Sequence, residues 1–185
     1  IEKGIDNSSK KASFIGEIGT GFDVVTENEK KVFISSALAQ KETGVFITTH
    51  TSLGKLGHEQ LDILKENGAN LEHVILGHTD LANDLDYIKS LLDRGVYIAF
   101  DTIGKISYLP EETRVKFIKE LCDNNWEDKL ILSVDITRRS HLKVNGGIGY
   151  AYLIKEFVPR LLEAGIEEHK INKLLVENPK KILGL

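Results

Sequence analysis

The sequence predicts an α/β fold made of five units, in each of which a strand is followed by a helix. Short runs rich in Val, Ile and Phe recur along the chain, and apolar residues with helical spacing follow them. Most of these runs are apolar throughout, as strands covered on both faces of a parallel sheet are. The predicted strands are residues 13–19, 44–49, 73–77, 96–102 and 130–136.

The first helix has a clear start. Thr26 and Glu29 form a capping-box pattern, in which each side chain can bond to the backbone N–H of the other residue. Phe33 and Ala37 follow at four-residue spacing, so they lie on one face of a helix. We therefore expect a helix that begins directly after Thr26.

The helix after the third strand has the strongest apolar stripe. Leu81, Leu85, Ile88 and Leu92 are spaced by four, three and four residues, which places them on one helical face. Gly95 then stands where a helix C-cap glycine is expected. The pattern predicts one helix from Leu81 to a cap at Gly95.

Three further apolar stripes predict three more helices, and all are interpreted as core. Pro110 suits the first turn of the earliest of them, and the last should end before Pro179. The stripes are Val115, Ile118 and Cys122; Leu153, Phe157 and Leu161; and Ile171, Leu174 and Leu175.

Four of the five strands have a metal-ligand residue at the carboxyl end. Periodicity alone leaves open a doubly wound sheet or a segment of a (β/α)8 barrel, but in both folds functional groups gather at that end. A single strand-end residue often only satisfies nearby backbone groups. Four together predict a shared metal site. They are Glu17, His50, His78 and Asp135.

This set of side chains suits a hydrolytic metal site. Zinc and related divalent ions bind imidazole and carboxylate, and a carboxylate such as Glu17 can bridge two of them. Hydroxide shared by two cations is a nucleophile near neutral pH. Asp135 is the candidate catalytic residue that accepts its proton.

A basic loop follows the last strand. Residues 137–149 hold Arg138, Arg139 and three glycines, and Lys105 can join them from the preceding loop. Backbone N–H groups and basic side chains at this place in a barrel often bind phosphate. These three residues are therefore the candidate substrate-binding groups. The alternative is that the glycines only turn the chain and the cations pair with surface carboxylates.

Charge and composition exclude several classes of partner. The formal net charge is −4 with both signs interspersed, which argues against nucleic acid. No apolar run approaches the roughly 18 residues that span a bilayer, so no membrane is expected. We expect a cytoplasmic protein with a small-molecule substrate, compatible with a homodimer. The chain opens on Ile1 and contains no Met, so we expect a fragment.

Five short motifs resemble, in order, strands four to eight of the phosphotriesterase-like branch of the amidohydrolase superfamily. Residues 135–149 are especially similar to the phosphotriesterase homology proteins of that branch. The motifs are GEIGT at 16–20, TTHT at 48–51, GHTD at 77–80, FDTIG at 100–104 and SVD at 133–135.

The resemblance implies a (β/α)8 TIM barrel with two divalent metals. It makes Glu17 the metal bridge, His50 and His78 ligands of one ion, and Asp135 a ligand of the other and the proton acceptor. Many members have a carboxylated Lys where this chain has Glu17. The family's His-x-His pair has no counterpart, so residues 1–185 are expected to be the C-terminal part of a single barrel that lacks strands one to three.

The expected function is a metal-dependent hydrolase that cleaves a lactone or related ester with a metal-bound hydroxide. The basic loop favours a phosphorylated sugar lactone. Zinc is the expected metal, with manganese, cobalt or iron as alternatives. Phosphotriester cleavage is the alternative enzymatic function. The alternative outside the enzymes is a non-catalytic barrel that binds metal or a phospho-ligand.

Overall fold

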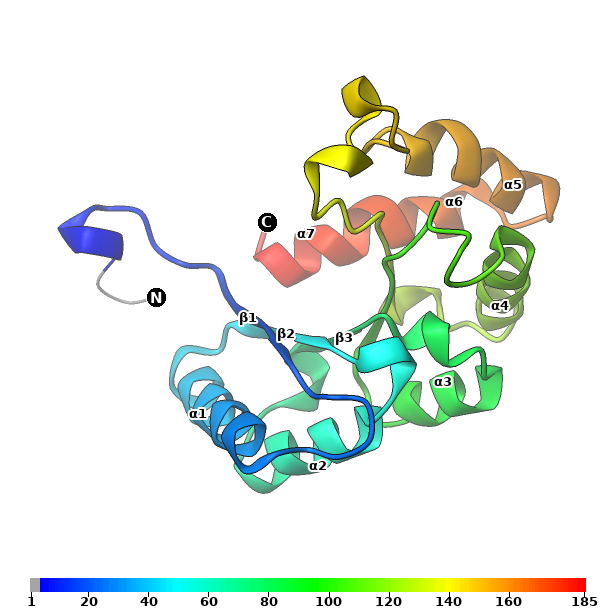
Figure 1. Ribbon diagram of the computed structural model, residues 1–185. Coiled ribbons are helices and arrows are strands. Elements are labelled where there is room, and N and C mark those ends of the chain that lie inside the picture. The colour runs from blue at the N-terminus through cyan, green and yellow to red at the C-terminus, as the bar shows by residue number, and fades with distance from the viewer. Residues whose placement is uncertain (1–3) are drawn as a thin grey trace.

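Five parallel strands form one sheet in residues 4–185, the part of the chain that the computed structural model describes (Figure 1). Each strand pairs with the next one in sequence, as successive βα units do. The predicted α/β fold is confirmed. The strands are β1 (Phe14–Gly19), β2 (Phe46–His50), β3 (Val74–Gly77), β4 (Tyr97–Phe100) and β5 (Leu130–Leu132).

The last two strands are shorter than the sequence predicted. β4 ends at Phe100 and β5 at Leu132, whereas the predicted strands continued to Thr102 and Ile136. The Ser133 N–H still donates to the Phe100 carbonyl at 3.0 Å, and the Ile103 N–H donates to the Ser133 carbonyl at 3.3 Å. The chain therefore stays beside its neighbour after regular pairing stops, and these irregular ends carry the polar residues described below.

Helices follow one another around the strands in chain order, as in part of a barrel wall (Figure 1). Their buried faces and the strands share one core, in which Phe33, Leu61 and Ile118 from helices meet Ile47 and Ile98 from strands. The helices are α1 (Glu27–Thr43), α2 (Gly57–Glu66), α3 (Leu85–Leu92), α4 (Glu111–Asp123), α5 (Val158–Glu163), α6 (Glu168–Asn172) and α7 (Asn178–Leu183). No helix in the described range has the length and hydropathy needed to cross a membrane.

The capping box of α1 is present as predicted. The Glu29 N–H donates to Thr26 Oγ1 at 3.3 Å, and the Thr26 N–H donates to Glu29 Oε2 at 2.7 Å. Pro110 is the N-cap residue of α4, immediately before its first turn. α2 lacks a side-chain cap, since Leu56 in a left-handed conformation precedes it, and no individual start signal predicted it.

The predicted helix from Leu81 to Gly95 is wrong at both ends. Leu81 lies in a separate 3-10 turn, Thr79–Ala82, and α3 begins at Leu85. Asp84 starts the helix by accepting a hydrogen bond from the Tyr87 N–H at 3.0 Å. Its C-cap is Asp93, while Gly95 has a φ of 89° and forms the next turn. The apolar stripe that starts at Leu81 thus spans two separate helical segments, the 3-10 turn and α3.

The expected helix end before Pro179 is also wrong. Helical conformation continues from α6 through a π-helical turn, Lys173–Glu177, into α7, where Pro179 lies at the start. Proline disrupts an α-helix because it lacks an N–H to donate and because its ring clashes with the carbonyl of the residue four positions earlier. The wider turn before Pro179 changes the hydrogen-bonding pattern there and lets the chain continue. The same arrangement, Leu153–Phe157, precedes Pro159 in α5.

Candidate active site

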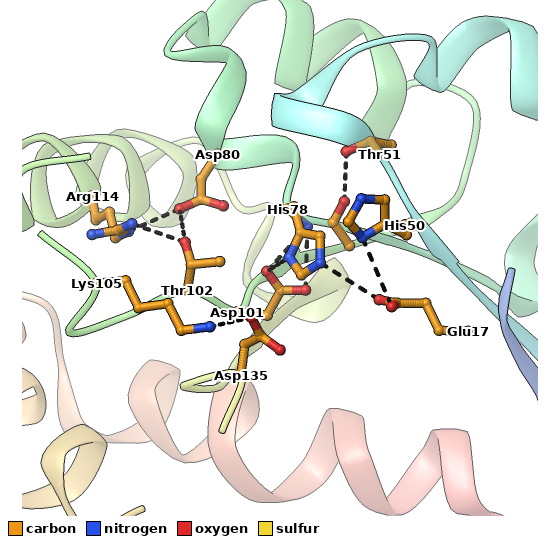
Figure 2. A network of polar contacts seen from close by, with 11 residues as sticks. Glu17, His50, Thr51, His78, Asp80, Asp101, Thr102, Lys105, Arg114 and Asp135 are labelled. Atoms are coloured by element: carbon orange, nitrogen blue, oxygen red, sulfur yellow. Dashed lines mark hydrogen bonds and ion pairs between the residues drawn. The ribbon is translucent and has the colours of Figure 1, made fainter. Parts of the chain in front are cut away.

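Four polar residues that the sequence singled out lie at the carboxyl end of the sheet. Glu17 lies in β1, His50 ends β2, and His78 follows β3 directly, while Asp135 comes three residues after β5. Figure 2 shows their side chains pointing toward a common region. The parallel strands bring together residues that are up to 118 positions apart, since 135 minus 17 is 118.

Glu17, His50 and His78 form the tightest group. One potential ligand atom from each lies within 4.8 Å of the others. Glu17 Oε2 is 3.8 Å from His50 Nδ1, and Glu17 Oε1 is 3.6 Å from His78 Nε2. These separations are too long for hydrogen bonds and suit donors around a cation. Two imidazole nitrogens and a carboxylate match the donor preference of zinc and related ions.

The backbone around this group is unusual in ways that shape it. The pairing of β1 with β2 shifts register between Ile15 and Ile18, the segment that carries Glu17. His78 and Asp135 have φ values of 61° and 43°, a left-handed conformation that costs energy outside glycine. A Cβ on Gly77 would lie 2.6 Å from the Thr49 carbonyl oxygen, so glycine is required beside His78.

Asp101 is a site residue that our sequence reasoning missed. Its carboxylate accepts from the His78 N–H at 3.0 Å and lies 2.7 Å from His78 Nδ1, which leaves Nε2 facing Glu17. A carboxylate on the second ring nitrogen is the usual way to orient a metal-binding histidine. Its signal was present in the sequence, since Asp101 follows β4 just as His78 follows β3.

The pKa of His78 responds to these acidic neighbours. Burial of the ring lowers its pKa, but the hydrogen bond that the ring donates to Asp101 and the negative charges of Asp101, Glu17 and Asp135 outweigh that effect and raise it to about 9. The site therefore favours positive charge at this position. A bound cation would satisfy the same field.

Asp135 lies beside the three-residue group and not within it. It forms an ion pair with Lys105 and lines a cavity of about 230 Å³ together with His50 and His78. Three of the four predicted residues thus share one cavity, which we call the histidine cavity, and Glu17 contacts its two histidines. The other lining residues are Ser52, Leu53, Leu81, Thr102 and Tyr108.

A second cavity of about 410 Å³ adjoins the first and holds basic groups. Lys105, Arg138 and His141 line this basic cavity, and Asp135 and Tyr108 line both cavities. Arg139 is exposed and outside the lining, where its carbonyl accepts from Asn145 Nδ2 at 2.6 Å. The sequence could not show that Arg138 lines the cavity and Arg139 does not.

Comparison with known proteins gives a consistent family. The model of the phosphotriesterase family matches residues 1–183. The phosphotriesterase homology protein of Escherichia coli K12 is 47% identical over 98% of this chain and 62% of its own length. The N-acetyltaurine hydrolase of Dictyostelium discoideum is 34% identical over 98% of this chain and 52% of its own length. This chain therefore spans between half and two thirds of these curated relatives.

Solved structures resemble this one closely. A phosphotriesterase homology protein from Escherichia coli, complexed with phosphate in its active site, superposes with a TM-score of 0.95 at 46% identity, over 99% of this chain and 63% of that one. A lactonase from Listeria monocytogenes superposes with a TM-score of 0.92 at 33% identity, over 99% of this chain and 57% of that one.

Proposed function

This chain belongs to the phosphotriesterase family, and from that premise we propose that it is part of a divalent-metal-dependent hydrolase that cleaves an ester-like bond. The observation that carries the proposal is the group of Glu17, His50 and His78, whose ligand atoms lie within 4.8 Å of one another at the carboxyl end of a parallel sheet. Hydrolytic sites of TIM barrels occupy that end.

The donor set indicates how metal would be held. His50, His78 and the Glu17 carboxylate would bind one ion, and Glu17 and Asp135 would bind a second together with ligands outside this chain. Zinc fits these donors, as do manganese, cobalt and iron. Such ions supply Lewis acidity that polarises a carbonyl and acidifies water.

The residues of this chain supply orientation and proton transfer. Asp101 fixes the ring of His78, which lines the histidine cavity, so that Nε2 faces Glu17. Asp135 lines that cavity, where its carboxylate can take a proton from the attacking water and return it to the leaving oxygen. Lys105 holds the Asp135 side chain in place through their ion pair.

The basic cavity indicates the substrate class. Its lining includes Lys105 and Arg138, and it meets the histidine cavity at Tyr108 and Asp135. A substrate could place its carbonyl at the histidines and an anionic end against the two cations. A phosphorylated sugar lactone has this form, and a guanidinium suits phosphate because it offers a planar pair of donors.

An amide with a sulfonate end is the second candidate. Relatives that are 29% to 34% identical are named N-acetyltaurine hydrolase, and a sulfonate is an anion with the same tetrahedral shape as phosphate. The same two cavities would accept it, with the acyl carbonyl at the histidines and the sulfonate at Lys105 and Arg138.

The test compares His50→Ala with His169→Ala in the whole protein. His169 is exposed and pairs with Glu167 on the surface, so it controls for the loss of an imidazole. We expect His50→Ala to lose bound metal and hydrolysis of the phosphorylated lactone or N-acetyltaurine. Full metal content and activity in His50→Ala would contradict the proposal. Bound metal with no turnover of lactone, amide or phosphotriester would favour a binding protein.

The anionic end is tested by Arg138→Ala, with Arg139→Ala as the matched control. Removing Arg138 should raise KM for a phosphorylated lactone on the order of tenfold or more, with little effect on its unphosphorylated analogue. Arg139 lies outside the cavity lining, so its removal should change neither by more than about twofold. Equal effects of Arg138→Ala on both lactones would exclude an anion contact at this residue.

A further inference from the structure

We propose that Arg114 and Glu111, at the start of α4, are positioning residues that fix the loop of residues 101–110. This loop carries Lys105 and Tyr108 into the lining of the two cavities. The inference rests on the proposed function, because the placement of these two side chains matters for catalysis only if the cavities receive substrate.

Arg114 joins both ends of the loop from a fully buried position. Its Nε donates to Asp80 Oδ2 at 2.8 Å, and its two terminal nitrogens donate to Thr102 Oγ1 at 2.9 Å and to the Leu109 carbonyl at 2.6 Å. Figure 2 shows the guanidinium beside Asp80 and Thr102. A guanidinium is a rigid planar group, so these contacts hold the start of the loop at a set distance from its end.

Glu111 fixes the backbone immediately before Lys105. Its Oε1 accepts from the Gly104 N–H at 2.6 Å, and its side chain is only 2% exposed. Gly104 has a φ of 88°, and a Cβ there would lie 2.7 Å from Ile148, so the loop passes close to the segment after β5. The Lys105 N–H then donates to the Thr102 carbonyl at 3.0 Å and completes the turn.

The charges of this cluster are better suited to defining a geometry than to adding stability. The Arg114 guanidinium pairs with two buried carboxyl groups, those of Asp80 and Glu111. The second oxygen of each carboxyl group, Asp80 Oδ1 and Glu111 Oε2, has no hydrogen-bond partner among the described residues. Burial raises the pKa of Asp80 to about 6 and raises that of Glu111, against the attraction of Arg114. Buried ion pairs with incomplete compensation are often no more stabilising than apolar residues.

The contacts of Lys105 show what the loop geometry controls. The Lys105 ammonium pairs with Asp135 in the wall shared by the two cavities, and Tyr108 belongs to the same wall. The Tyr108 N–H donates to the Lys105 carbonyl at 3.0 Å, so the two residues belong to one turn. A shift of about 1 Å in such a wall is enough to reduce catalysis substantially. Arg114 and Glu111 would therefore act on substrate through Lys105 and Tyr108.

The test uses Glu111→Ala and Glu111→Gln in the whole protein, with Glu112→Ala as the matched control. Glu112 lies on the same helical turn with its side chain 81% exposed. In Glu111→Ala, the partly buried Gly104 N–H loses its acceptor, so hydrogen exchange in residues 103–109 should accelerate on the order of tenfold. Glu111→Gln keeps an acceptor oxygen and should restore slow exchange, and Glu112→Ala should match the unmodified protein.

The kinetic readout separates positioning from a purely structural effect. Glu111→Ala should raise KM for a phosphorylated lactone by about tenfold more than KM for the unphosphorylated analogue, while any fall in kcat that acts through Asp135 should be the same for both lactones. Arg114→Lys retains a buried positive charge but cannot contact Asp80, Thr102 and Leu109 together. It should change exchange and KM in the same direction, and it provides the test if Glu111→Ala does not fold.

Three results would overturn the inference in different ways. Unchanged exchange in both Glu111→Ala and Arg114→Lys would show that these residues do not restrain the loop. A second result is faster exchange but unchanged KM in Glu111→Ala and Arg114→Lys, while Lys105→Ala raises KM for the phosphorylated lactone alone. This would show that the restraint does not position Lys105. If Lys105→Ala itself affects both lactones alike, the anionic subsite of the proposed function fails, and with it the reason to position this lysine.

Discussion

At the scale of single residues, the candidate site depends on side chains that constrain one another. His78 has a left-handed backbone conformation, its ring and N–H are both held by Asp101, and glycine precedes it because no larger residue fits. Each constraint acts directly on His78, and together they direct its Nε2 toward Glu17. Preorganisation of this kind lowers the entropy lost when a ligand binds.

The first residue-scale prediction concerns Asp101. Asp101→Asn removes the negative charge that orients the His78 ring, so metal affinity should fall by about 10-fold to 100-fold, as it does when such partners are removed from metal sites. Competition with a chelator measures the affinity. Asp93→Asn, at an exposed position outside the site, should have no effect. Equal affinities for the two variants would show that Asp101 does not support the metal site.

Cys122 gives a prediction about pH. Burial, followed by the charge of Glu127, raises the pKa of its thiol to about 11. Because the thiolate is the reactive form, folded protein should not react with iodoacetamide at pH 8, and labelling should begin only as the pH approaches 11 or the protein unfolds. Mass spectrometry of labelled protein measures this. Rapid labelling of folded protein at pH 8 would show that the thiol is accessible, in conflict with its 1% exposure.

At the scale of elements, the helices of this chain have two kinds of start. α1 and α3 begin at side chains that accept backbone N–H groups, Thr26 and Asp84. α2, α5 and α7 have no side-chain cap and depend on the preceding chain and on packing. Caps are visible in a sequence, whereas packing is not. This difference explains why the start of α1 was predicted and that of α2 was not.

The capping box yields a prediction for stability. Thr26→Ala removes the acceptor for the Glu29 N–H, so the free energy of unfolding should fall by about 1 kcal/mol. Urea denaturation measures the difference. Ser35→Ala, at an exposed position within α1, should change stability by less than about 0.5 kcal/mol. A Thr26→Ala protein as stable as Ser35→Ala would mean that the capping contacts contribute nothing.

At the scale of the whole molecule, the sheet is open at β1. Its residues are exposed or half-buried, whereas all four residues of β4 are buried, and Phe14 is 49% exposed. β1 pairs only with β2 among the described strands. Its other edge presents backbone groups that can pair with another chain. Glu17 lies on this strand, so the same edge contributes to the candidate site.

The open edge predicts self-association of residues 1–185 when they are produced alone. A sheet edge flanked by exposed apolar residues is a template for pairing between chains. Analytical ultracentrifugation should therefore show an average mass that increases with protein concentration. Phe14→Lys should reduce this association because a charge on an edge strand opposes pairing. Val144→Lys, in a loop away from β1, is the control. Monomeric behaviour of the unmodified chain at high concentration would contradict the prediction.

The α/β class and the first capped helix could be read from the sequence because they depend on neighbours within a few residues. Apolar runs separated by helical stripes define βα units, and Thr26 meets Glu29 three positions later. The four candidate ligands could also be placed at one edge of the sheet, since carboxyl ends of parallel strands gather there whatever the loops between them do. The family motifs pointed to the same residues.

Only the tertiary structure decided which residues touch. Asp101 is 23 positions from His78, and Arg114 is 34 from Asp80, so local spacing carries no sign of either contact. Arg138 and Arg139 are adjacent in the sequence and both exposed, yet Arg138 lines the basic cavity and Arg139 does not. Lys105, predicted as a substrate contact, also pairs with Asp135. Loop conformation sets these outcomes, because the direction of a side chain outside regular structure follows from backbone angles that no repeating pattern encodes.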